Sequence, residues 1–135
     1  MGMLALYIKS FSYKQGYPLD SSMHGGGYVF DCRSLPNPGR DPAFRSLTGL
    51  DSEVIQYLSK DPLVEEFLSR SIALVEQHVR VFLDRNFDYV SVAFGCTGGQ
   101  HRSVFCAESL CASVRENFDI QVSVEHIQLK AMGFL

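Results

Sequence analysis

The segment from Phe94 to Ser103 (FGCTGGQHRS) holds the residues of this sequence best suited to chemistry. Its three glycines let backbone N–H groups approach an anion without a side chain in the way. A helix that begins at the end of the segment would add unpaired N–H donors and the positive end of its dipole. We therefore interpret the segment as a loop that binds phosphate or a similar anion.

The side chains of this glycine loop favour the same kind of ligand. Arg102 carries a fixed pair of donors that fits two phosphate oxygens, and His101 can donate to an anion near neutral pH. The alternative is a tight turn between a strand and a helix, with a solvent-exposed arginine. We expect these residues of the loop to bind the ligand: Thr97, Gly98, Gly99, Gln100, His101, Arg102 and Ser103.

Common nucleotide and metal motifs are absent from the loop. It has no lysine where the pattern G-x-x-x-x-G-K-[ST] needs one, and it does not contain G-x-G-x-x-G. A zinc site made from Cys96, His101 and Cys106 is disfavoured, because residues five apart on one helix point to different faces. We expect neither a metal nor a cofactor.

Cys96 and Arg102 give the loop a second interpretation. A cysteine, five residues, an arginine and a serine resemble the signature of cysteine-based phosphatases, in which a thiolate attacks phosphorus and the arginine holds the oxygens. Those enzymes usually have histidine before the cysteine, where this chain has Gly95, and a general acid would have to be Asp31 or Asp41. We keep a phosphatase with Cys96 as nucleophile as an alternative to a binding domain without catalysis.

Strands and helices alternate along the chain. Apolar, β-compatible runs predict four strands, over residues 3–10, 28–31, 89–94 and 120–124. Apolar residues at helical spacing predict helices that begin at Thr48 or Asp51 and end at 58, that run over 61–85, and that continue from the glycine loop to 118. Three prolines make the segment 35–42 a structured loop, because proline lacks a backbone donor.

This alternation predicts one α/β domain over residues 1–135, a small three-layer sandwich with a mainly parallel sheet. Ligands of such sheets lie at the carboxyl ends of the strands. Asp31 and Arg33 follow the second strand as the glycine loop follows the third, so we expect them at one crevice. Asp31 would bind a hydroxyl or amine group and Arg33 a phosphate, the alternative being a surface ion pair.

Composition narrows the function classes further. A chain of 135 residues with 46% hydrophobic residues can bury a core, and its net charge of −3 argues against a strongly nucleic-acid-binding surface. No apolar run approaches the ~20 residues of a membrane span, and the run that begins at Met1 lacks the charged start of a signal peptide. The cysteines form no C-x-x-C pair. We expect a cytoplasmic protein with reduced thiols and no membrane partner.

Four segments carry a family pattern: SFSYKQGYPLD (10–20), VFDCRSLPNP (29–38), LTGLD (47–51) and GCTGGQHRS (95–103). They resemble the C-terminal domain of the RapZ (YvcJ-type) RNase adapter proteins over about residues 8–126. The resemblance implies a fold similar to the ligand-binding half of phosphofructokinase. It also implies a pocket for an amino-sugar phosphate, glucosamine-6-phosphate being the best candidate, formed by Asp31, Arg33, Thr97, Gly98, His101 and Arg102.

In full-length members the resemblance further implies binding of small RNAs and an RNase, and self-association. This chain departs from the family in three ways: the nucleotide-binding N-terminal domain is missing, Gly39 replaces a histidine, and residues 125–135 contain one lysine in place of a basic tail. Arg40 beside Gly39 can keep a phosphate contact, whereas loss of the tail predicts weak RNA binding. We expect a regulatory domain that binds a phosphorylated metabolite. An RNA or RNase adapter is the alternative, and apolar Phe134 and Leu135 are compatible with a homo-oligomer.

Overall fold

The protein was analysed as a computed structural model that describes residues 3–135. Met1 and Gly2, the start of the run considered above as a signal peptide, lie outside the described residues. The strands are β1 (Ala5–Ser12), β2 (Tyr28–Asp31), β3 (Tyr89–Cys96) and β4 (Gln121–His126). The helices are α1 (Ser52–Ser59), α2 (Pro62–Asp84), α3 (Arg102–Asn117) and α4 (Ile127–Ala131), and two 3₁₀ turns are η1 (Pro38–Arg40) and η2 (Pro42–Phe44).

The four strands form one sheet in which every pair is parallel, in the order β2-β3-β1-β4. In the register of β2 and β3, Asp31 lies opposite Gly95. The segments that follow these two strands therefore leave the sheet side by side, at its carboxyl edge. The predicted α/β class and parallel sheet are confirmed.

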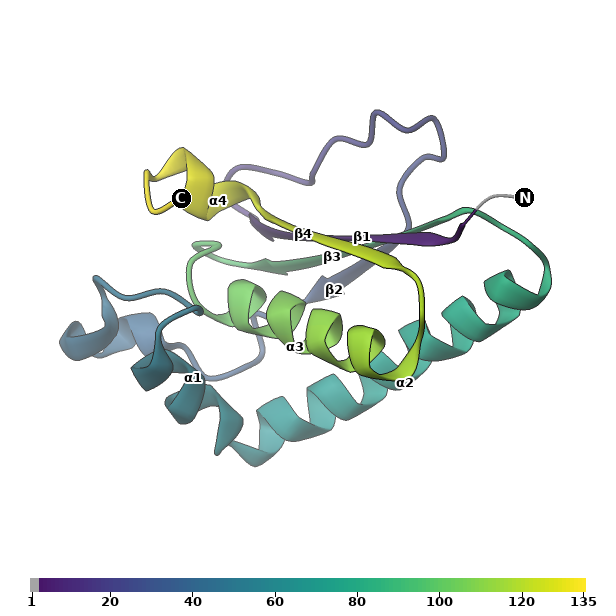
Figure 1. The fold of residues 1–135 in the computed structure, drawn as a ribbon. Coiled ribbons are helices and arrows are strands. Elements are labelled where there is room, and N and C mark those ends of the chain that lie inside the picture. The colour runs from purple at the N-terminus through teal and green to yellow at the C-terminus, as the bar shows by residue number, and fades with distance from the viewer. Residues whose placement is uncertain (1–2) are drawn as a thin grey trace.

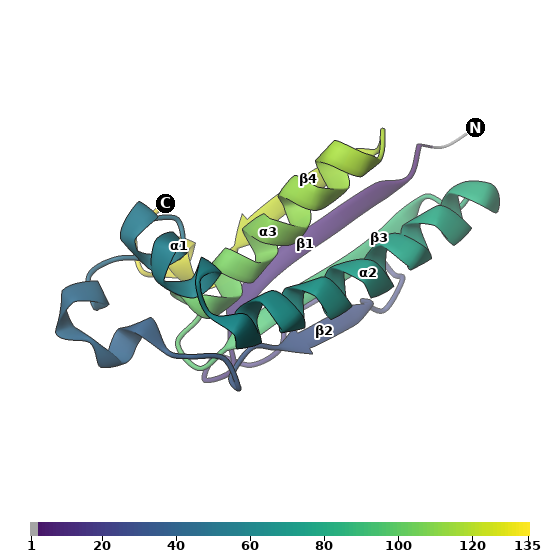
Figure 2. The same ribbon diagram turned by 90° about the horizontal axis from the view of Figure 1, so that it is seen from below.

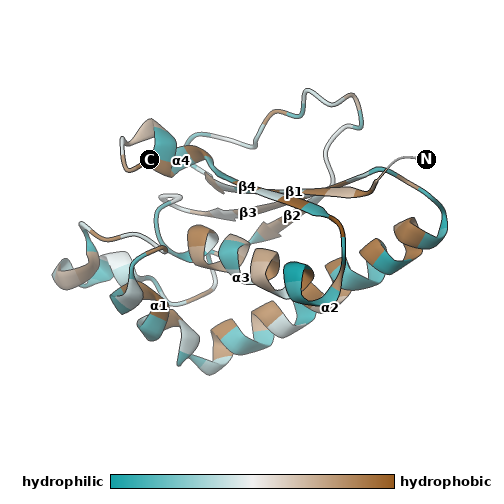
Figure 3. Cartoon of the chain, viewed as in Figure 1, coloured by the Kyte–Doolittle hydropathy of each residue, from teal (hydrophilic) through white to brown (hydrophobic). Residues whose placement is uncertain are grey.

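The sheet is the middle one of three layers. Helices α1, α2 and α3 cover one face of the sheet, and the segment between β1 and β2 crosses the other face (Figures 1 and 2). Alternate residues of β1 face the two sides, so Leu6 and Ile8 are buried under the helices while Tyr7 is 41% exposed. Hydrophobic and hydrophilic bands alternate along α2, as expected for a helix with one buried side (Figure 3).

The helix starts follow the predicted capping residues. The Asp61 carboxylate accepts a hydrogen bond from the backbone N–H of Leu63 at 2.9 Å, and Pro62 occupies the first turn of α2. Asp51 is the residue before α1, and its carboxylate accepts from the backbone N–H of Thr48 at 2.7 Å. Of the two residues predicted to begin this helix, Asp51 is the one at the cap.

The structure corrects three boundaries near the carboxyl edge. β1, predicted over residues 3–10, begins at Ala5 and continues to Ser12. β3, predicted to end at residue 94, continues to Cys96 because it pairs with β1 as far as Ser12, which lies opposite Cys96. β4 continues past residue 124 to His126, and α4 follows it directly. The sequence predicts no helix here, because five residues are too short for a clear helical period.

The proline-rich segment 35–42 is a structured loop, as predicted, but it contains η1 and the start of η2. The Asn37 side chain accepts from the backbone N–H of Gly39 at 3.0 Å, and Asp41 accepts from that of Ala43 at 3.0 Å. Each Asx–Pro pair therefore begins a short turn. No helix within residues 3–135 combines the length and the apolar character needed to cross a bilayer.

Candidate anion-binding site

A cavity of about 720 Å³ opens at the carboxyl ends of β2 and β3. Three arginines from different elements line it: Arg33 follows β2, Arg40 ends η1, and Arg102 begins α3. Thr97 of the glycine loop also lines the cavity, and Asn37 and Asp41 add a polar wall. Of the residues predicted to bind a ligand, the structure brings Arg33, Arg40, Thr97 and Arg102 to this one cavity.

Arg102 is the most deeply buried of the three arginines, with 5% of its surface exposed. Its Nη1 donates to the backbone carbonyls of Arg33 and Leu35, each at 3.0 Å. Its Nε and Nη2 have no hydrogen-bond partner among the described residues. No fully buried side-chain nitrogen in that part of the chain lacks a partner, so these two donors reach the surface of the cavity.

The guanidinium of Arg102 also forms no ion pair within residues 3–135, although the charges of Asp31 and Arg102 do interact at longer range. No carboxylate oxygen in this range lies within 4.0 Å of it. Burial strips water from a charge, so a buried arginine normally pairs with a carboxylate or another anion. An anion in the cavity would supply this missing charge and accept from the open donors.

Arg33 is already paired. Its Nη2 lies 2.7 Å from Oδ2 of Asp31, and its Nε lies 2.9 Å from Oδ1. The guanidinium carbon also lies 3.8 Å from the centre of the Tyr13 ring. The hydrogen bonds from Arg33 hold the pKa of Asp31 below its ordinary value, against an opposing effect of burial. Asp31 does not line the cavity, so the structure places its carboxylate on Arg33 and away from the position expected for a ligand contact.

His101 and Gln100 support the neighbouring loop. Nε2 of His101 donates to the carbonyl of Phe44 at 2.9 Å. Nε2 of Gln100 donates to the carbonyls of Arg45 and Leu47, at 2.8 and 2.7 Å. Neither side chain lines the cavity, and these bonds fix the segment that carries Arg40 against the start of α3.

The backbone of the glycine loop is held between β1 and α4. Gly99 has φ +68°, and a Cβ there would lie 2.8 Å from Cβ of Gln128 and 2.9 Å from the backbone nitrogen of Ser12. The Ser12 hydroxyl donates to the carbonyl of Thr97 at 2.7 Å. Gly98 has no atom within 4 Å of the position its Cβ would occupy. Packing therefore requires glycine at Gly99 but not at Gly98, and it also requires Gly95, where a Cβ would lie 2.5 Å from the Phe11 ring.

Cys96 and Ser103 bind each other beneath the loop. The thiol donates to Oγ of Ser103 at 3.1 Å, and the backbone N–H of Ser103 lies 3.4 Å from Sγ. Both residues are buried, and neither lines the cavity. The phosphatase with Cys96 as nucleophile stays a prediction; in this structure the thiol is bonded to Ser103 and does not line the cavity.

A family model described as the RapZ C-terminal domain matches residues 4–130. The chain belongs to the RapZ C-terminal domain family. The resemblance predicted from the four sequence segments is confirmed.

Three relatives, each named nucleotide-binding protein, illustrate the similarity. The Laribacter hongkongensis protein is 44% identical over 115 residues, which are 85% of this chain and 40% of the relative. The Alkalilimnicola ehrlichii protein is 44% identical over 128 residues, 95% of this chain and 42% of the relative. The Paraburkholderia phymatum protein is 47% identical over 109 residues, 81% of this chain and 35% of the relative. The chain thus spans about two-fifths of the length of these relatives.

The four cysteines of this RapZ C-terminal domain are all buried and unpaired. The pKa of the Cys32 thiol is raised well above its ordinary value. The largest cause is a hydrogen bond with Cys106, and burial is the second. Burial likewise raises the pKa of Cys111. Among the described residues, no three histidine, cysteine or acidic side chains are grouped to hold a metal ion.

Sequence reasoning missed part of the cavity wall of this RapZ C-terminal domain. Tyr57 of α1 and Leu63 of α2 line the cavity, yet nothing in their local sequence marks them. Asn37 and Asp41 were not proposed as ligand contacts, although each precedes a proline and so carries the signal of a capped turn. This signal predicts the local turn but not the cavity that the turn encloses.

Proposed function

We propose that this domain binds a phosphorylated small molecule at the three-arginine cavity and serves as a regulatory module. One observation carries the proposal: Arg102 is 5% exposed as a residue, has no carboxylate within 4.0 Å among residues 3–135, and has open donors at the surface of a cavity. A phosphate group matches these features because it is an anion with several acceptor oxygens.

The rest of the cavity supports a polar ligand around that phosphate. Arg40 is exposed and lines the cavity, so it can approach further phosphate oxygens. The Thr97 hydroxyl can donate to the same group. Asn37 and Asp41 offer oxygen acceptors for hydroxyl or amine groups. An amino-sugar phosphate such as glucosamine-6-phosphate, which the family resemblance implies, has both kinds of group and is our first candidate.

The relatives' name suggests a nucleotide as a second kind of phosphorylated ligand. They are more than twice as long as this chain, and the name does not say which part binds. A ligand panel must therefore contain nucleotides as well as sugar phosphates. Binding of RNA or an RNase and self-association stay predictions of the resemblance.

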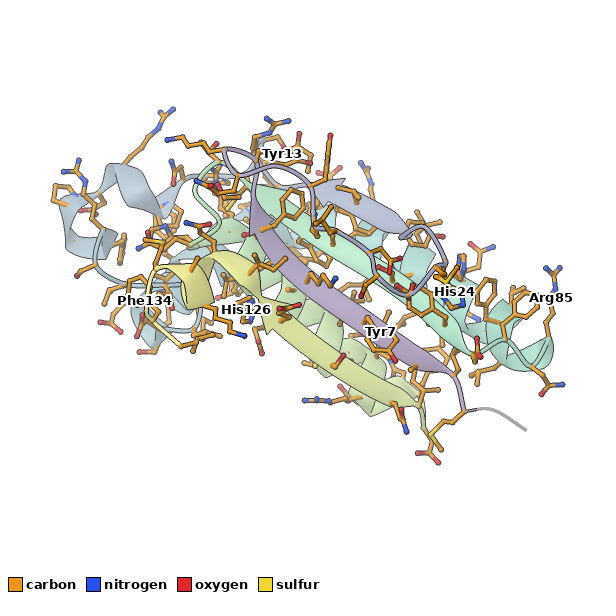
Figure 4. The ribbon with its side chains drawn as sticks, turned by 90° about the horizontal axis from the view of Figure 1, so that it is seen from above. Tyr7, Tyr13, His24, Arg85, His126 and Phe134 are labelled. Carbon is orange, nitrogen blue, oxygen red and sulfur yellow. The ribbon has the colours of Figure 1, made fainter. Side chains whose placement is uncertain are left out.

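The test is thermal unfolding of the purified chain with a panel of inorganic phosphate, hexose phosphates, glucosamine-6-phosphate and nucleotides. A ligand at a hundred times its dissociation constant should stabilise the fold by about 2.7 kcal/mol. Arg102→Met should lose this shift. Arg85→Met is the matched control, because Arg85 projects from the opposite end of the molecule (Figure 4).

A second variant guards against loss of folding in the first. Arg40 is exposed, so Arg40→Ala should fold normally and still weaken phosphate binding measured by calorimetry. The proposal is wrong if no phosphorylated compound shifts the wild-type unfolding temperature. It is also wrong if Arg102→Met and Arg40→Ala bind such a compound as tightly as Arg85→Met does.

A further inference from the structure

One wall of the anion cavity is a segment of the chain that lies between β2 and α1. We call residues 34–47 the strap; they contain η1 and η2 and project beside α1 (Figure 2). Arg40 and Asp41 line the cavity from the strap, whereas Tyr57 of α1 and Arg102 of α3 line it from other elements. The cavity therefore lies between the strap and the rest of the fold.

Few hydrogen bonds hold the strap in place. Residues 36–47 have three hydrogen bonds to other segments of the described chain, and all three come from the side chains of Gln100 and His101. The backbone–backbone hydrogen bonds of this range stay inside it. Apolar contacts include the rings of Phe44 and Tyr57, whose centroids lie 5.4 Å apart. A segment with so few hydrogen bonds to its surroundings can open without unfolding of the sheet.

Three consecutive residues dock the two ends of the strap. Arg102 donates to the carbonyl of Leu35 at its start, at 3.0 Å. Gln100 and His101 donate to carbonyls within residues 44–47 at its end, at 2.7 to 2.9 Å. Arg102 is also the residue with open donors at the cavity. Docking of the strap and binding of an anion therefore involve the same side chain.

The charges of the cavity favour docking of the strap when an anion is present. Arg33, Arg40 and Arg102 line the cavity, and Asp41 is the one carboxylate that lines it within residues 3–135. Without an anion, a docked strap brings the like charges of Arg40 and Arg102 to one cavity. A phosphate that contacts both arginines attracts them instead. It therefore binds the docked form more tightly and shifts the population towards that form.

We propose that the strap docks over the cavity when an anion binds, with Gln100 and His101 as positioning residues that hold its end. This inference rests on the proposed function and describes how the same site is regulated. The coupling is reciprocal: an anion stabilises the docked strap, and loosening the strap weakens anion binding. The occupied and the empty site then differ in the order of this segment.

Hydrogen exchange measured by mass spectrometry tests the coupling, with inorganic phosphate and glucosamine-6-phosphate as probes. Residues 42–47 are the readout, because none of them lines the cavity and a probe there cannot shield them by direct contact. When a probe that binds by calorimetry is saturating, their amides should exchange about tenfold more slowly. Amides of residues 18–27, which cross the other face of the sheet, should not change (Figure 1).

Gln100→Ala separates docking of the strap from contact with the anion. It removes two hydrogen bonds to the strap, and Gln100 does not line the cavity. Without a probe, residues 42–47 should exchange about tenfold faster, and probe binding should weaken by about threefold or more. Gln77→Ala is the matched control, because Gln77 is exposed on α2 and does not line the cavity.

Arg40→Ala tests the charge on the strap and does not depend on the folding of Gln100→Ala, because Arg40 is exposed. A saturating probe should then slow the exchange of residues 42–47 by less than about threefold, since it no longer attracts the strap. Protection as strong as in the wild-type chain would show that the strap does not respond through this charge, and the inference would be wrong.

The remaining outcomes separate this inference from the proposed function. If a probe binds the wild-type chain but leaves the exchange of residues 42–47 unchanged, the strap inference is overturned while the anion site stands. The inference is also wrong if Gln100→Ala exchanges faster in this range yet binds the probe as tightly as Gln77→Ala does. If no phosphorylated compound and no inorganic phosphate binds, both proposals fall.

Discussion

Two buried polar clusters lie near the carboxyl edge of the sheet, and they differ in how completely they are paired. In one, Oγ of Ser10 lies 2.7 Å from Nδ1 of His126, and Nε2 of His126 lies 2.7 Å from Oε2 of Glu108. In the other, Arg102 holds two backbone carbonyls but meets no carboxylate among residues 3–135. His126 stands at the end of β4 in Figure 4.

The difference separates a structural cluster from a ligand site. Both ring nitrogens of His126 have protein partners, so burial leaves nothing for a ligand to satisfy. Arg102 keeps two donors without a partner among residues 3–135, and a molecule in the cavity can accept from them. We call the fully paired His126 cluster the closed cluster and the Arg102 cluster the open cluster. Breaking the closed cluster should therefore lower mainly the stability of the fold, whereas breaking the open cluster should weaken mainly ligand binding.

The largest expected effect is on binding at the open cluster. Arg102→Met should weaken the tightest phosphorylated ligand of the panel by about 30-fold or more, because truncating one partner of a buried charge pair costs at least about 2 kcal/mol. Isothermal calorimetry measures this change, with Arg85→Met as control. An affinity within threefold of wild type would show that Arg102 is not the anion contact.

Breaking the closed cluster should lower the stability of the fold. His126→Phe leaves the buried Ser10 hydroxyl without its partner, which should lower the free energy of unfolding by about 2 kcal/mol. Urea unfolding measures the loss, and Ser123→Ala at an exposed position of β4 is the control. Ligand affinity should stay within about threefold of wild type. A strong loss of affinity with unchanged stability would reverse the distinction between the two clusters.

The glycine loop lies between the two clusters, and its neighbouring glycines should behave differently. Gly99→Ala forces a side chain into φ +68° and against Gln128 and Ser12, so it should cost about 1–2 kcal/mol of stability. Gly98→Ala meets no atom within 4 Å and should leave the unfolding temperature nearly unchanged. Equal destabilisation by the two variants would contradict the packing described for this loop.

The smallest expected effect concerns the paired arginine. The pKa of Asp31 is lowered in the folded chain, chiefly by hydrogen bonds from Arg33. The stability this pair contributes is therefore present above the ordinary carboxyl pKa, near 4, and is lost as the pH falls through the lowered folded value. Both side chains are about half exposed, so the contribution should be below about 1 kcal/mol.

Asp31→Asn tests this linkage. Its unfolding temperature should be slightly below that of wild type at pH 7, and the two should converge as the pH is lowered toward 2. Asp119→Asn is the control, because Asp119 is exposed between α3 and β4 and forms no salt bridge in the described chain. A difference that persists unchanged at pH 2 would show that the Asp31 carboxylate acts through something other than its ionised pair with Arg33.

Local patterns determined much of the fold. Apolar runs placed the four strands, and Asp61 with Pro62 marked the start of α2, because strand burial and helix capping depend on residues that are near in sequence. The short α4 escaped this reasoning, since one turn and a half of helix has no clear period and is held by packing on β1.

For the site, the sequence by itself determined that a glycine loop with Arg102 follows a buried strand, and that parallel strands bring it near Arg33. Only the tertiary structure decided which side chains face the cavity. His101 and Gln100 turn to carbonyls more than fifty residues away, and Arg33 pairs with Asp31. Spacing along a chain limits which residues can meet, but a polar side chain takes the partner that three-dimensional packing places within hydrogen-bond distance.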